Sequence, residues 1–209
     1  MHTHDAPAVK RQWLTDRVGG LEDALVARGL VTSTDVDDIV ELFRDKLGPQ
    51  RGGALVARAW TDPDFHDRML ADATAVLREF GYDGHGATHG SLPFMQLVVV
   101  ENTADVHNLV VCTLCSCYPL ALLGPPPRWY KSAEFRARAI RRPREVLSEF
   151  GTEVPDGVQV RVWDSTADCR YLVLPQRPPG TDGLAPDRLA ALVTPNSLIG
   201  TERDLRATD

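Results

Sequence analysis

Three of the chain's four cysteines lie within six residues, in the stretch Val-Cys-Thr-Leu-Cys-Ser-Cys-Tyr-Pro at 111–119. Their spacing is C-x-x-C-x-C, and neither a helix nor a strand places residues at offsets of three and then two on one face. The side chains converge only if the backbone curls around one point. Three thiolates at one point repel each other, and a bound cation removes that repulsion and deprotonates the thiols. The spacing therefore favours a metal-binding claw at residues 112–117, with Cys112, Cys115 and Cys117 as ligands.

Two other interpretations of these cysteines stay open at this point. A Cys-x-x-Cys pair is also the pattern of a redox dithiol, which usually lies near a βαβ unit, whereas here a third cysteine and then prolines follow. A structural zinc site needs a fourth ligand, and the candidates are His107 and the remote Cys169. A metal claw with an open coordination position needs no further residue.

The stretch resembles the metal-binding motif of the alpha subunit of nitrile hydratase, which also occurs in the related gamma subunit of thiocyanate hydrolase. The likeness spans residues 34–200 and includes segments on both sides of the cysteines, at 100–103, 107–108, 123–124, 126–127, 129–131, 171–178, 179–183 and 198–200. It implies an α+β fold with an N-terminal helical arm and a layered α/β/β/α catalytic domain. We expect the arm at 1–80 and the metal-binding catalytic domain at 81–209.

The resemblance also implies a ligand set. Cys112, Cys115 and Cys117 would supply three sulfurs, Ser116 and Cys117 two deprotonated backbone nitrogens, and a water or hydroxide the sixth position. Cys115 would be oxidised to a sulfinic acid and Cys117 to a sulfenic acid, both known steps of cysteine oxidation. The implied catalytic residues are Cys115, Ser116 and Cys117. The nucleophile stays open between a metal-bound hydroxide and the Cys117 sulfenate.

Two residues of the motif distinguish the metals that the resemblance offers. Cobalt members of the family have C-T-L-C-S-C, often followed by Tyr-Pro, whereas iron members have C-S-L-C-S-C followed by Thr. Thr113 and Tyr118 match the cobalt pattern. We therefore expect Co(III), with Fe(III) as the alternative, and an accessory protein that inserts the metal.

Composition limits the classes of partner. The chain has 209 residues and a formal net charge of −6, which disfavours nucleic acid. No segment approaches the roughly 18 apolar residues of a membrane span, and residues 1–8 carry no apolar signal-peptide core. We therefore expect no membrane partner and a cytoplasmic location. The resemblance implies a beta-type subunit, as one chain or split into two, whose arginines pair with the oxidised claw.

Hydrophobic periodicity predicts helices before the cysteines and a mixture of strands and helices around them. The predicted helices are at 13–26, 34–43, 53–60, 63–80, 130–140, 144–150 and 186–193. The predicted strands are at 95–101, 108–113, 158–163 and 169–174, with the last two paired as a hairpin. The apolar faces of the N-terminal helices pack either on a partner or on the chain's own domain, and the sequence does not separate these alternatives.

Several other residues have a structural interpretation. His85 and His89 lie in a glycine-rich segment that favours a surface loop, and His107 and Cys169 are expected in or near the core. The basic run at 136–144 favours a solvated face. It could instead pair with carboxylates of a partner or stabilise an anionic claw.

The sequence departs from the family directly after the claw. Many nitrile hydratases have Cys-Tyr-Pro-Trp-Pro there, whereas this chain has Leu120 and Ala121. A smaller pocket wall would admit a bulkier substrate, such as the nitrile of a nucleoside like toyocamycin. The resemblance thus implies the catalytic alpha subunit of a cobalt nitrile hydratase, which hydrates a nitrile to an amide. The alternatives are a thiocyanate hydrolase subunit and a non-catalytic metal-binding or metal-delivery module with unmodified thiols.

Overall fold

The computed structural model describes residues 6–35, 48–82, 96–115 and 117–205. The chain forms two compact units, Met1–Lys46 and Leu47–Asp209. Most of the predicted helix at 34–43 lies outside the described residues, as do His85, His89 and Ser116. The two units are described separately below.

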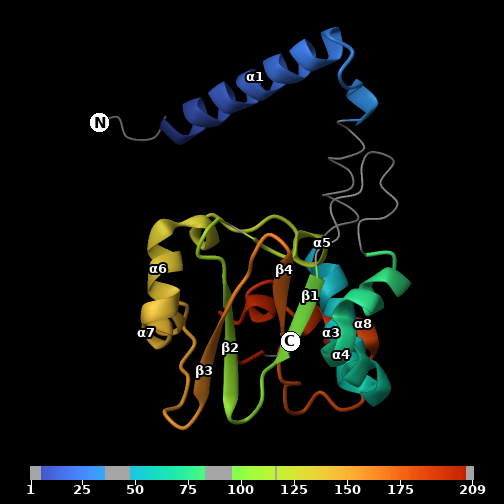
Figure 1. The fold of residues 1–209 in the computed structure, drawn as a ribbon, viewed down its shortest axis with the longest axis vertical. Helices are drawn as coiled ribbons and strands as arrows, with labels where there is room; N and C mark the ends of the chain where they lie inside the picture. The colour runs from blue at the N-terminus through green and yellow to red at the C-terminus, as the bar shows by residue number, and fades with distance from the viewer. Residues whose placement is uncertain (1–5, 36–47, 83–95, 116, 206–209) are drawn as a thin grey trace. The chain divides into compact units, whose positions relative to one another are not determined.

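The main element of the first unit is a single helix, α1 (Ala6–Ala27; Figure 1). The pair Gly19-Gly20 does not interrupt it, because a glycine inside a helix costs only about 1 kcal/mol relative to alanine. Large apolar side chains of α1 are exposed, among them Trp13 at 55% and Leu21 at 62%. Within its own unit, α1 therefore leaves these apolar side chains uncovered.

The second unit contains the remaining described helices and all the described strands. Its helices are α3 (Pro49–Thr61), α4 (Pro63–Glu79), α5 (Leu120–Leu123), α6 (Ala133–Arg141), α7 (Pro143–Glu149) and α8 (Pro186–Leu192), with 3-10 turns η2 (Trp129–Lys131) and η3 (Ser197–Ile199). Its strands are β1 (Gln96–Glu101), β2 (Val106–Val111), β3 (Gln159–Asp164) and β4 (Cys169–Leu174). The helices α3 and α4 thus belong to the same compact unit as the strands, while the functional division at residue 80 stays a prediction.

The four strands form two parallel pairs. β1 pairs with β4 and β2 pairs with β3, each over six residues in continuous register. The predicted hairpin between 158–163 and 169–174 is therefore wrong. Parallel neighbours need a long crossover connection, and the crossover from β2 to β3 carries α5, α6 and α7. That crossover supplies helices that bury the strands, which a hairpin alone would not do.

Helices cover the strands on both sides. In Figure 1, α6 and α7 lie on one side of the strands, and α3, α4 and α8 lie on the other. One core unites these layers, with almost fully buried side chains such as Leu55 of α3, Leu109 of β2, Leu147 of α7 and Leu172 of β4. This arrangement confirms the predicted α+β class. No helix among the described residues is both long and apolar enough to cross a membrane.

A network of buried polar groups surrounds His107 and Asn108 of β2. The Nε2 atom of His107 lies 2.8 Å from the carbonyl oxygen of Gly200, and its Nδ1 atom lies 3.3 Å from the side-chain amide of Asn102. The indole nitrogen of Trp163 donates to the side-chain oxygen of Asn108 at 2.8 Å. Both ring nitrogens of His107 are therefore occupied, which agrees with its predicted structural role.

Candidate metal centre

The claw begins where β2 ends. Leu109, Val110 and Val111 are fully buried, and so is Cys112, so the end of the strand holds this cysteine in a fixed position within the core. On the far side of the claw, Pro119 precedes the one-turn helix α5, and its carbonyl oxygen accepts hydrogen bonds from the amides of that helix. The claw is therefore a short loop held between a buried strand and a helix.

The three predicted cysteine ligands converge in the structure. The Sγ atom of Cys115 lies 3.5 Å from that of Cys112 and 3.1 Å from that of Cys117, and all three lie within 4.8 Å of one another. Cys112 and Cys117 are buried, whereas Cys115 is exposed. In the described part of the chain this is the one group of three or more His, Cys, Asp or Glu ligand atoms that converges. His107 and Cys169 do not belong to it, so the fourth zinc ligand considered above is not brought to the claw.

The electrostatics of the claw fit a bound cation. Burial, and then the hydrogen bonds with the neighbouring sulfurs, raise the pKa of the Cys117 thiol to about 12, while the positive charge of Arg170 acts in the opposite direction. At neutral pH such a thiol stays protonated unless a metal ion displaces its proton. Three converging sulfurs are soft ligands and suit a transition metal. The donor set therefore fits the metal that the sequence predicts.

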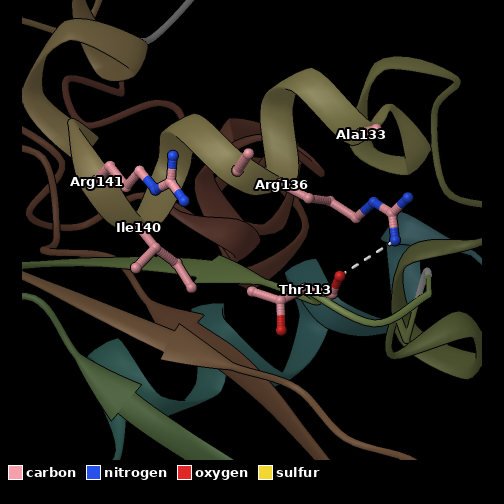
Figure 2. A pocket seen from close by; sticks show the side chains of 6 residues that line it. Thr113, Ala133, Arg136, Ile140 and Arg141 are labelled. Atoms are coloured by element: carbon pink, nitrogen blue, oxygen red, sulfur yellow. Dashed lines mark hydrogen bonds between the residues drawn. The ribbon is translucent and has the colours of Figure 1, made fainter.

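Thr113 lies between the first two cysteines, and its amide, hydroxyl and carbonyl groups all form hydrogen bonds. Asp164, the last residue of β3, accepts hydrogen bonds from the Thr113 amide at 2.9 Å and from its hydroxyl at 2.6 Å. The Nη1 atom of Arg136 on α6 donates to the Thr113 carbonyl oxygen at 3.2 Å (Figure 2). The first turn of the claw is thus fixed from two separate elements.

Tyr130 fixes the other end of the claw. Its hydroxyl donates to the carbonyl oxygen of Cys117 at 3.0 Å, and its ring packs edge-on against Tyr118 with the centroids 5.0 Å apart. Tyr130 is fully buried, and burial raises its pKa far above the ordinary value. The hydroxyl is therefore protonated at neutral pH and can donate this hydrogen bond.

The cysteines were identified from the sequence, but the residues that hold them were not. Asp164 and Arg170 carried no local signal, Tyr130 lay in a segment of the family resemblance without a role assigned to it, and Arg136 belonged to a basic run with several interpretations. Spacing rules do not relate residue 113 to residue 164. The β2–β3 pairing does, because it places Asp164 opposite Val111. Knowledge of that pairing is what would have identified the aspartate.

Comparison with known proteins gives the family context. A sequence model of the family described as "Nitrile hydratase, alpha chain" matches residues 12–202. The chain is 50% identical over 184 residues to the low-molecular weight cobalt-containing nitrile hydratase subunit alpha of Rhodococcus rhodochrous, covering 88% of this chain and 86% of that one. It is 38% identical over 184 residues to the thiocyanate hydrolase subunit gamma of Thiobacillus thioparus, covering 86% and 75%.

A solved structure shows the same fold. A double mutant of the Fe-type nitrile hydratase from Comamonas testosteroni Ni1 matches with a TM-score of 0.81 and 40% sequence identity, covering 92% of this chain and 90% of that one. The likeness therefore extends over most of the chain in both sequence and structure.

Proposed function

This chain belongs to the nitrile hydratase alpha-chain family, and from that premise we propose that it is the metal-carrying catalytic subunit of a cobalt nitrile hydratase. The reaction adds water to a nitrile and yields an amide. The observation that carries the proposal is the convergence of the Cys112, Cys115 and Cys117 Sγ atoms within 4.8 Å of one another. The exposed side of Cys115 leaves this cluster open to a substrate.

The proposed metal is trivalent cobalt. The three sulfurs and the backbone nitrogens of Ser116 and Cys117 would hold it, and the ion would supply a Lewis acid for the nitrile. Thr113 and Tyr118 support cobalt because they match the cobalt pattern, and the Rhodococcus relative is a cobalt protein by its name. Iron stays the alternative, since the Comamonas structure is of Fe type.

Cys115, Ser116 and Cys117 are the proposed catalytic residues. Oxidation of Cys115 to a sulfinic acid and of Cys117 to a sulfenic acid would place oxygens at the open side of the claw. A sulfenate oxygen on Cys117 could take a proton from the attacking water, or attack the nitrile itself. The hydrogen bonds of Tyr130 and Asp164 to the claw backbone would keep these atoms in position.

The proposed partner is a beta-type subunit, as one chain or two. Oxidised cysteines add negative charge, and a buried charge without a partner is costly. Arg170 is one cation of this chain that acts on Cys117, so further counter-charges would come from the partner. The exposed apolar side chains of α1 also favour a partner that covers them. We propose a cytoplasmic location, where thiols stay reduced until the metal binds.

The test is to produce the chain with its beta-type subunit, cobalt and a metal-insertion accessory protein. We expect about one cobalt ion per chain, three added oxygens on the claw peptide by mass spectrometry, and conversion of a nitrile to its amide. The chain alone should show little activity. Tightly held zinc in a fully active enzyme, or full activity from the single chain, would contradict the proposal.

Two alternatives have specific tests. The 38% identical gamma subunit supports a thiocyanate hydrolase, in which case thiocyanate would be consumed faster than any nitrile. A metal-delivery module would carry unmodified thiols and exchange its ion readily with a chelator. Oxidised cysteines would exclude the delivery module, and a nitrile converted faster than thiocyanate would exclude the thiocyanate hydrolase.

The proposed substrate class is a bulky heteroaromatic nitrile, with a nucleoside nitrile such as toyocamycin as an example. Leu120 begins α5 three residues after Cys117 and is partly exposed, while Leu122 and Leu123 are buried beneath it. An indole at position 120, as in many relatives, would take up space on the outer side of α5. Its absence here supports a wider pocket.

Leu120→Trp tests this proposal, with Ala121→Pro as the matched control. Both changes restore a family residue after the claw, but only the first adds volume, and a proline is tolerated in the first turn of a helix. A methylene-sized change in a pocket is worth roughly 1–3 kcal/mol. We therefore expect the rate ratio of a bulky to a small aliphatic nitrile to fall by about a hundredfold or more in Leu120→Trp. An unchanged ratio would show that residue 120 does not line the pocket.

A further inference from the structure

One short segment of the chain contacts both ends of the claw. From this segment, the Nη1 atom of Arg136 donates to the carbonyl oxygen of Thr113 at 3.2 Å, and the hydroxyl of Tyr130 donates to the carbonyl oxygen of Cys117 at 3.0 Å. Figure 2 shows the Arg136 side chain extending from α6 to Thr113. Thr113 follows the first cysteine of the claw, and Cys117 is the last. Two anchors from residues 129–136 thus hold the claw at its beginning and at its end.

Ser132 joins the two anchors through the backbone. Its amide donates to the carbonyl oxygen of Trp129 at 3.0 Å, and its carbonyl oxygen accepts from the Arg136 amide at 3.2 Å and from the Arg136 Nε at 3.4 Å. Its side-chain oxygen accepts from the amide of Phe135 at 3.1 Å and so caps α6. The turn η2, which carries Tyr130, is therefore tied directly to the first turn of α6, which carries Arg136.

Aromatic packing makes the same segment rigid. The ring of Trp129 packs against Phe135, with centroids 5.0 Å apart, and against Phe150 of the helix α7 end, with centroids 4.5 Å apart. The ring centroids of Tyr130 and Phe135 are 5.8 Å apart, and both side chains are buried. Close-packed interiors transmit displacements from one side chain to the next. A movement of this segment therefore shifts both claw carbonyl groups together.

The third support of the claw is of a different kind. Asp164 of β3 accepts hydrogen bonds from the amide and the hydroxyl of Thr113, so it holds only the first turn. A loop that is held at one end alone is free to open at the other. A sulfur that moves away with the loose end no longer shares a metal ion with the other two. Convergence of the three sulfurs therefore depends on both ends of the claw.

The two anchors differ in their contact with water. Arg136 and Thr113 line a cavity of about 360 Å³ (Figure 2), so water reaches this end of the claw. Tyr130 is fully buried and Cys117 is 8% exposed. Water can replace part of a lost hydrogen bond at the Thr113 end, whereas a buried carbonyl oxygen at the Cys117 end would stay unpaired. Loss of the Tyr130 anchor should therefore cost more than loss of the Arg136 anchor.

We propose that Tyr130 and Arg136 act together as a clamp that keeps the three claw sulfurs converged around the metal ion. The inference rests on the proposed function, which supplies that metal. Neither side chain is among the proposed ligands, so both are positioning residues for the reaction. The clamp works only while both of its hydrogen bonds are made, because release of either end separates Cys112 or Cys117 from the other sulfurs.

The experiment is a double-mutant cycle of Tyr130→Phe and Arg136→Met in the complete cobalt-loaded complex. Arg138→Met is the matched control, because it removes the same charge from the same helix, but Arg138 pairs with Glu134 and Glu149 and not with the claw. The rate of cobalt loss to a chelator, the absorption spectrum of the metal–sulfur centre, kcat and KM are measured for each variant. Circular dichroism checks that each variant is folded.

We expect Tyr130→Phe to raise the rate of cobalt loss by about tenfold or more and Arg136→Met by about fivefold, because each leaves a claw carbonyl without its donor. The double variant should exceed Tyr130→Phe by no more than about twofold, since one open end already releases the metal. Both single variants should alter the absorption spectrum and lower kcat with little change in KM. Arg138→Met should stay within about twofold of the wild type, as expected for an exposed ion pair.

Two results would overturn the clamp. Unchanged cobalt loss in either single variant would show that its hydrogen bond does not hold the metal. A double variant whose rate is the product of the two single effects, roughly fiftyfold, would show two independent anchors.

Arg136→Lys separates the hydrogen bonds from the charge. Lysine keeps the positive charge but lacks the planar fork with which arginine reaches the Thr113 and Ser132 carbonyl oxygens at once. The clamp predicts that this variant still loses cobalt faster than the wild type, and it replaces Arg136→Met in the cycle if that variant does not fold. Wild-type retention of cobalt in Arg136→Lys would mean that charge alone matters, and the clamp would be refuted.

The outcomes also separate the clamp from the proposed function. A complex that binds cobalt and hydrates nitriles, but whose two single effects multiply, overturns only the clamp. A complex that shows the coupled loss of cobalt but hydrates no nitrile overturns only the proposed reaction. A chain that takes up no cobalt in the presence of its beta-type subunit and the accessory protein overturns both.

Discussion

The two parallel strand pairs end in different kinds of site. At the carboxyl ends of β2 and β3 lies the claw, where burial, and then the hydrogen bonds with the neighbouring sulfurs, raise the pKa of the Cys117 thiol. At the carboxyl ends of β1 and β4 lies a second pocket of about 390 Å³, lined among others by Trp60, His66, Glu101 and Arg177. The turn at 102–105 reverses the chain between β1 and β2, so the two sites face opposite ways.

The second pocket satisfies its charges within the chain. The Nε2 atom of His66 lies 2.9 Å from a carboxylate oxygen of Glu101, and Arg177 donates to the backbone carbonyl oxygens of Trp60 and Thr181. The claw has no such balance, because burial disfavours the anionic form of Cys117 and a bound cation would be needed to offset it. Both strand pairs are parallel and six residues long, yet the residues at their carboxyl ends differ in how their charges are balanced. The charged side chains of the second pocket are paired within the chain, whereas the cysteines of the claw need a bound cation.

The largest expected effect is the loss of a claw sulfur. Cys112→Ser should abolish cobalt binding, because a hydroxyl is a poorer ligand than a thiolate for this ion. Cys115→Ser and Cys117→Ser should do the same and also remove a site of oxidation. Cys169→Ser is the matched control and should keep the metal, since Cys169 lies outside the cluster. Elemental analysis of the purified complexes decides, and full cobalt occupancy in Cys112→Ser would refute the ligand assignment.

The strand that carries the claw should be sensitive to its backbone support. Gly200 has φ +82°, and a Cβ there would lie 1.8 Å from the carbonyl oxygen of Asn108 on β2. Gly200→Ala should therefore lower the free energy of unfolding by about 3 kcal/mol or more. Gly151 has φ +78° with nothing within 4 Å of its Cβ position, so Gly151→Ala measures the left-handed strain alone, at about 1–2 kcal/mol. Urea unfolding of both variants gives the comparison, and equal losses would show that β2 yields to the extra methyl group.

A smaller effect is expected at the far end of the claw. Tyr130→Phe leaves the Cys117 carbonyl oxygen without its 3.0 Å hydrogen bond and should cost about 1–3 kcal/mol of stability, with faster loss of cobalt to a chelator. Tyr118→Phe is the control in the same aromatic contact, because the Tyr118 hydroxyl has no hydrogen bond among the described residues. Chelator challenge and thermal unfolding of both variants test this. Identical behaviour would mean that the hydroxyl of Tyr130 does not position the claw.

Features made by residues close together in the sequence could be predicted, and features made by distant residues could not. The claw was predictable because its three sulfurs lie within six residues, and the helix caps around Asp62 and Pro63 are equally local. The strand pairing was not, because the chain between β3 and β4 crosses from one pair to the other. The amide of Ser165 still extends the β2–β3 ladder by donating to Val111. Each of these strands pairs instead with a strand more than 45 residues earlier in the chain, and short-range hairpin rules do not contain that information.

The last comparison uses two histidines, His66 of α4, which contacts Glu101 just before the 102–105 turn, and His107, which follows that turn. The hydrogen bond with Glu101 raises the pKa of His66, whereas burial lowers the pKa of His107. A raised pKa contributes stability that is complete below the ordinary value of 6.5 and is lost as the pH rises through the folded-state value. A lowered pKa acts in the opposite direction. The stability linked to His107 is complete above pH 6.5 and is lost as the pH falls below it.

His66→Gln should therefore remove a stabilisation that exists in acid and disappears in alkali. The difference in unfolding free energy between the wild type and this variant should be largest below pH 6.5 and shrink as the pH rises. It should stay below about 1 kcal/mol, because both partners of the pair are partly exposed and water screens their attraction. Urea titrations at a series of pH values measure it, and high salt should reduce it further. A difference that grows with pH would show that Glu101 does not stabilise the charged imidazole, and the second pocket would then lack the internal charge balance that distinguishes it from the claw.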